Sequence, residues 1–109
     1  MARDHGLEAL IDDDLGSVSR VTSKGMFGGW AWLVRNHLLC GARHDGLLVR
    51  LGKGNDGWAL QIDGISPMYS GSRPMHGWVR ADASAYDDEQ IRSRLLSAAL
   101  QFVGTLPPR

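Results

Sequence analysis

Four short β-forming segments follow one another between residues 18 and 51, and their connectors are short enough for hairpins. The segments cover residues 18–24, 30–35, 38–43 and 47–51. The connectors 35–37 and 44–46 are turn-like, and the Asp45-Gly46 step is a strong signal for a tight hairpin. Parallel neighbours need a crossover of a dozen or more residues, which this region lacks. We therefore expect an antiparallel meander.

Helical patterns flank this meander. Apolar residues recur at helical spacing in residues 7–15, and again from Asp87 onward, where acids open the helix and Pro107-Pro108 follow its end. Between them we expect a short helix over 58–62, a loop over 64–74 and a strand over 76–81. The chain has 109 residues, a size typical of one domain with one core. The sequence predicts a single α+β domain over residues 1–109, a two-layer antiparallel sheet with helices on one face.

Alternation along the strands separates a core face from a second face. The buried residues predicted from strand parity and from the last helix are Leu38, Cys40, Leu47, Val49, Leu51, Leu95, Ala99 and Phe102. The candidate site residues on the second face are Lys24, Arg50, Arg73, His76, Trp78 and Arg80. We expect no helix to cover this basic and aromatic face, so that alanine at Arg50 or Arg80 leaves folding nearly normal.

The charges of the chain cancel as a total but not along its length. Twelve basic and twelve acidic side chains give a net charge of zero, which counts against nucleic acid and anionic membranes as general partners. Residues 1–15 are acidic, whereas residues 16–54 are basic. One cysteine, no long apolar run and no signal-peptide pattern lead us to expect a cytoplasmic protein without a membrane segment.

The sequence contains no recognisable catalytic or metal-binding pattern. The four histidines lack ligand spacing, and Cys40 on an apolar face is expected to be a buried hydrophobe, so we predict no metal and no cofactor. The glycines of Met26-Phe27-Gly28-Gly29 are interpreted as a bulge or close packing. We expect the run 12–14 to be a solvated acidic face, and Arg92 to extend from its apolar arc to water. Leu100, on the far side of that helix, indicates a contact with a partner or a second copy.

Two motifs resemble the TfoX N-terminal domain family. Residues 21–30, Val-Thr-Ser-Lys-Gly-Met-Phe-Gly-Gly-Trp, are similar to its opening signature, and residues 73–79, Arg-Pro-Met-His-Gly-Trp-Val, to a second segment of the family. The resemblance implies the order helix, three strands, helix, one or two strands, helix. The best-known members are bacterial competence regulators with a further C-terminal domain, and we expect this chain to be a stand-alone first domain.

Two classes of function fit these features. The first is a non-catalytic regulatory or adaptor module, involved in transcription regulation, that binds a protein partner or a second copy of itself. The second is binding of a small anionic ligand, or of nucleic acid, by the basic and aromatic face, where His76 is the one residue suited to acid–base work. We prefer the first class because the resemblance favours it and no catalytic grouping is visible. We do not expect an enzyme.

Overall fold

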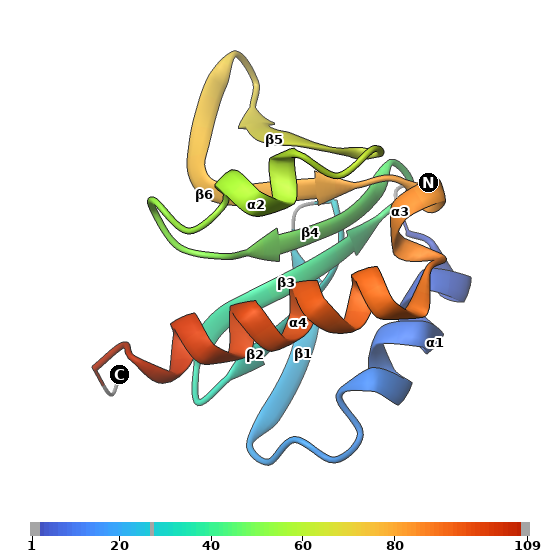
Figure 1. The fold of residues 1–109 in the computed structure, drawn as a ribbon. Coiled ribbons are helices and arrows are strands. Elements are labelled where there is room, and N and C mark those ends of the chain that lie inside the picture. Colours follow the sequence, from blue (N-terminus) through green and yellow to red (C-terminus); the bar gives the residue numbers. More distant parts are fainter. Residues whose placement is uncertain (1–2, 27, 108–109) are drawn as a thin grey trace.

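A computed structural model describes residues 3–26 and 28–107, which form one six-stranded antiparallel sheet with helices packed on it (Figure 1). The strands are β1 (Val21–Met26), β2 (Gly29–Val34), β3 (His37–Arg43), β4 (Gly46–Arg50), β5 (Ile65–Ser70) and β6 (Arg73–Ala81). The helices are α1 (His5–Asp14), α2 (Gly57–Leu60), α3 (Ala83–Tyr86) and α4 (Glu89–Gly104). The sheet order is β1-β2-β3-β4-β6-β5. The predicted α+β class and antiparallel sheet are confirmed.

The first four strands form the expected meander because their turns are tight. Arg35 and Asn36 connect β2 to β3, with φ angles of 50° and 71°. Positive φ at both central residues is the conformation that twists a two-residue hairpin correctly. Gly29 begins β2 against the backbone of β3, where a Cβ would collide with the Ala42 carbonyl. Close packing therefore accounts for this glycine, whereas Phe27 lies outside the described residues.

The long helix α4 provides most of the second layer. Figure 1 shows it in front of the sheet along β3, with α1 and α3 near its N-terminal end, and it contacts both β3 and β4. Asp88 caps the helix by accepting hydrogen bonds from the backbone N–H groups of Gln90 and Ile91, at 2.9 and 3.1 Å. Leu95 and Ala99 on its inner face are fully buried. No helix of the described part is long and apolar enough to span a bilayer.

A bulge in β3 changes the predicted parity of that strand. Trp32 pairs with Cys40 and Leu33 pairs with Leu38, so Leu39 is an extra residue between them. Leu39 and Cys40 are both fully buried in the core, whereas Leu38 is only half-buried. The prediction of a buried Leu38 was wrong because an extra residue shifts side-chain alternation by one position.

The β5 strand corrects the predicted loop over residues 64–74. Only Gly71 and Ser72 form the turn, and β5 pairs with β6 along most of its length. Pro67 is tolerated because β5 is an edge strand, where a missing N–H disrupts no second ladder.

The structure also has four strands before α2, not the three that the resemblance implies, and a separate α3 before α4.

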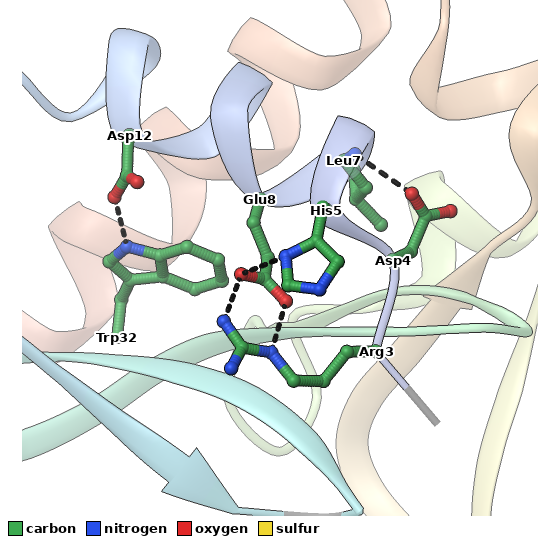
Figure 2. A network of polar contacts seen from close by, with 7 residues as sticks. All are labelled: Arg3, Asp4, His5, Leu7, Glu8, Asp12 and Trp32. Atoms are coloured by element: carbon green, nitrogen blue, oxygen red, sulfur yellow. Dashed lines mark hydrogen bonds and ion pairs between the residues drawn. The ribbon is translucent and has the colours of Figure 1, made fainter. Parts of the chain in front are cut away.

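The acidic run at the end of α1 is exposed, as expected for a solvated face, but two of its carboxylates also accept hydrogen bonds from within the fold. Asp12 accepts a hydrogen bond from Trp32 Nε1 at 2.8 Å (Figure 2), and Asp14 accepts one from Arg92 Nε at 2.5 Å. Arg3, just before α1, donates to both carboxylate oxygens of Glu8, at 2.9 and 2.6 Å, and holds the Glu8 pKa below its usual value. The contacts of Asp12 and Asp14 attach α1 to the sheet and to α4.

Arg92 and Leu100 also differ from their predicted environments. Arg92 does not extend to water: its side chain is 8% exposed, and Nη1 donates to the Tyr86 carbonyl at 2.8 Å. Leu100 packs against the hydrophobic core and is half-buried. Because both side chains have partners inside the molecule, neither by itself indicates a dimer interface.

Candidate functional site

The strand order separates the six predicted site residues. Lys24 lies on β1, at the edge of the sheet, whereas Arg50 lies on β4 and the other four lie on β6. Strands β2 and β3 separate Lys24 from Arg50. Arg73 lies at the tip of the β5–β6 hairpin, where it pairs with Ser70 and is exposed. The structure therefore does not bring Lys24 and Arg73 together with the rest.

Arg80 is bound within the fold. Its Nη1 donates to the Asp45 carbonyl at 2.7 Å and its Nη2 to Ser66 Oγ at 3.1 Å, so it joins the β3–β4 turn to β5. A hollow of about 350 Å³ next to it is also lined by Arg43 and Asp45. Burial alone would raise the Asp45 pKa, but the hydrogen bonds and charge of Arg43 outweigh it and lower the pKa. Asp45 thus compensates the charge of Arg43, whereas Arg80 is held by hydrogen bonds to uncharged groups instead of facing only solvent.

Arg50, His76 and Trp78 do share a hollow, together with residues that sequence reasoning did not select. The hollow has a volume of about 360 Å³ and is lined by Arg50, Gly52, Lys53, His76, Gly77, Trp78 and Phe102. The Arg50 guanidinium carbon lies 5.5 Å from the centre of the Phe102 ring, and Nη1 donates to the Leu38 carbonyl at 3.2 Å. Since Phe102 belongs to α4, the expectation that no helix covers Arg50 was wrong.

A close approach of two backbone segments creates this hollow. The N–H groups of Leu51 and Gly52 both donate to the Gly77 carbonyl, at 2.7 and 3.1 Å. Gly52 and Gly77 have φ angles of 94° and 87°, in the left-handed region. A Cβ on Gly77 would lie 2.6 Å from the Gly52 carbonyl carbon and from the Lys53 nitrogen. Because of this close approach, the chain that follows β4 packs against β6 at Gly77, and Lys53 and His76 line the same hollow.

A second hollow, with no charged residue in its lining, also includes Phe102. It has a volume of about 590 Å³ and is lined by Leu51, Gly54, Asn55, Gly57, Trp58, Ala98, Gln101, Phe102 and Thr105. Arg94 stacks on Trp58, with its guanidinium carbon 4.1 Å from the ring centre. We call the two hollows together the Phe102 groove, and its residues are those that line either hollow. Phe102 is half-buried, which corrects its predicted burial.

Only weak sequence signals pointed to the residues that were missed. Trp58 and Phe102 are interpreted from the pattern as ordinary apolar residues of two helices, and Lys53 as a charge in a turn. The glycine-rich break at residues 52–57 was the one sign that the chain leaves the sheet there. Nothing in a one-dimensional pattern relates that break to the end of α4.

The described residues do not add a metal-ligating cluster to the site. They contain no cluster of three or more His, Cys, Asp or Glu side chains that could hold a metal ion. Cys40 is fully buried, and burial raises the pKa of its thiol far above the usual range. The thiolate, which is the nucleophilic form, is therefore scarce at neutral pH.

We expect Cys40 to resist thiol reagents in the native protein. Because its sulfur is both buried and protonated, labelling should require opening of the fold, and its rate should rise sharply with denaturant. The measurement is the absorbance of released thionitrobenzoate after Ellman's reagent is added, with and without urea. Rapid labelling of one thiol in native buffer would contradict this description of the core.

The family model of the TfoX N-terminal domain matches residues 13–103, from the end of α1 through most of α4. This match covers most of the chain, and the chain belongs to the TfoX N-terminal domain family, a competence-related domain. No curated protein and no solved structure matches the chain.

Proposed function

We propose that this domain is a non-catalytic regulatory or adaptor module that acts by binding a protein partner along the Phe102 groove. The observation that carries the proposal is the shape of that groove. Two adjoining hollows share one aromatic side chain, and half-buried Trp58 and Phe102 line it. Partly exposed aromatic side chains in a concave surface are the usual anchors of protein interfaces. Membership of a competence-related family supports a regulatory role.

A second candidate is a binding site for a small anion at the Arg50 hollow. It is favoured by one observation, that Arg50, Lys53 and His76 line a hollow of about 360 Å³ without an acidic side chain. The continuation of this hollow into an uncharged one favours an occupant longer than a free anion. We therefore place partner binding first.

The proposal predicts that Trp58→Ser weakens partner capture. Truncating an interface anchor of this kind typically costs about 2 kcal/mol, which corresponds to roughly thirtyfold in affinity. The measurement is quantitative capture of proteins from the native host by the tagged domain. Ala98→Gln, which fills the uncharged hollow from the α4 side, should act in the same direction without removing packed atoms.

The matched control is Tyr69→Ser. Tyr69 is an aromatic residue that is 52% exposed and lies on β5, outside the Phe102 groove. Its loss should leave capture unchanged. If Tyr69→Ser and Trp58→Ser reduce capture equally, or if neither does, the groove is not the binding surface.

A further inference from the structure

The Phe102 groove differs in charge from two other hollows of the described surface. The hollow beside Arg80 contains Asp45, and the hollow between α1 and α4 contains Asp14 and Glu89. In the Arg50 hollow, Arg50 and Lys53 meet no acidic lining residue. Arg50 is half-buried and contacts a carbonyl and an aromatic ring, neither of which neutralises its charge. This end of the groove is therefore complementary to an anion.

The other end of the groove has the opposite character. Its lining includes Leu51, Trp58, Ala98 and the Phe102 ring, with Asn55, Gln101 and Thr105 as polar groups and no charged side chain. An apolar side chain buried there would lose contact with water without separating any charge from its counter-charge. Because Phe102 lines both hollows, an occupant that crosses its ring reaches both ends.

We propose that the partner segment bound in the Phe102 groove is an acidic peptide, with a carboxylate at the Arg50 and Lys53 end and an apolar side chain beside Trp58. This inference rests on the proposed partner-binding function and specifies the partner's chemistry. A nucleic acid strand would need cations spaced along successive phosphates. The larger hollow has no cation among its lining residues, and the nearby Arg94 is stacked on the Trp58 ring. A free inorganic anion would leave the larger hollow empty.

Selection from a displayed library of random linear peptides on the immobilised full chain tests the inference. We expect selected peptides to combine Asp or Glu with a neighbouring Leu, Ile, Phe or Trp. Replacing the acids by Asn or Gln in synthetic versions should weaken binding about tenfold or more, measured by tryptophan fluorescence or calorimetry. This arm uses the unaltered protein, so it does not depend on how any variant folds.

A matched pair of charge reversals locates the effect. Lys53→Glu should weaken binding of the selected peptides about tenfold, because the exposed Lys53 lines the groove. Lys24→Glu makes the same change at an exposed position on β1 and should leave binding as in the wild type. Equal effects of the two reversals would indicate a general field effect and overturn the assignment.

Other outcomes would also overturn the inference. One is a set of selected peptides that is not enriched in Asp or Glu, and another is amide-substituted peptides that bind as tightly as the acidic ones. A third is a single-stranded oligonucleotide that binds the domain more tightly than any peptide and binds the Lys53→Glu variant more weakly. Complete displacement by inorganic phosphate, with no effect of the apolar residue, would assign a free-anion site instead.

If host-protein capture depends on Trp58 while no acidic peptide is selected, this inference fails and the proposed function stands. If acidic peptides bind but Trp58→Ser and Ala98→Gln leave host capture unchanged, the proposed function fails alone.

Discussion

Gly77→Ala is expected to lower the free energy of unfolding by about 3–4 kcal/mol, a large fraction of the stability of a small domain. Two costs combine. The φ angle of 87° is unfavourable for alanine, which costs about 1 kcal/mol or more. The new Cβ would also lie 2.6 Å from backbone atoms of Gly52 and Lys53, which cannot move aside as a flexible side chain would. Thermal unfolding followed by circular dichroism should show a midpoint lower by roughly 10–20 °C.

The control for this prediction is Gly54→Ala. Gly54 has a φ angle of 81°, close to that of Gly77, but a Cβ on Gly54 would have no atom within 4 Å beyond its chain neighbours. The substitution therefore introduces the backbone cost without the collision, and about 1 kcal/mol is expected. Equal losses in the two variants would show that the approach of β6 to the chain after β4 is not close in solution.

Arg92→Met should lower the free energy of unfolding by about 2–3 kcal/mol. Methionine keeps most of the volume but removes the donors to Asp14 Oδ2 and to the Tyr86 carbonyl. The Asp14 side chain is 26% exposed, so water partly replaces the lost partner, and the cost stays below that of a fully buried ion pair. Urea unfolding measures the loss, and Arg73→Met, at an exposed arginine, should change stability by less than about 0.5 kcal/mol.

A double-mutant cycle with Asp14→Asn separates the pair from the rest of the site. If Arg92 stabilises the fold mainly through Asp14, the double variant should lose clearly less than the two single losses added together. Additive losses would mean that the carbonyl contact and packing of Arg92 carry its contribution, and that α1 is held to α4 by other contacts.

Features that depend on neighbouring positions were predicted, and features that depend on strand pairing were missed. The hairpins were predicted because turn residues and alternation are properties of adjacent residues, and α4 because its apolar arc recurs along the whole helix. The β5 strand was missed because proline, glycine and serine resemble a loop until an edge position in the sheet makes them acceptable. The bulge at Leu39 was missed because its signal, one extra residue opposite a pair, exists only once two strands are paired.

The candidate site divides in the same way. Sequence alternation placed Arg50 and Trp78 on related faces, and they are indeed paired positions on β4 and β6. It could not separate them from Lys24 and Arg73, since strand order in a sheet does not follow the order of the segments along the chain. It also could not supply Lys53, Trp58 or Phe102, which reach the groove from a turn and two helices.

The amino-acid pattern alone established the class of fold, the antiparallel meander, the long C-terminal helix and, through two motifs, the family of this chain. The fold features depend on residues that are near one another along the chain, and the family depends on motif residues that match those of the family. Three-dimensional packing established which charges are compensated and which are left facing a hollow. Asp45 neutralises Arg43, and Asp14 pairs with Arg92, whereas Arg50 and Lys53 meet no acid in the hollow that they line. The partners of a charge or an apolar side chain are the groups that lie close to it in space. Here the pairing of β4 with β6 and the position of α4 on the sheet decide which groups those are.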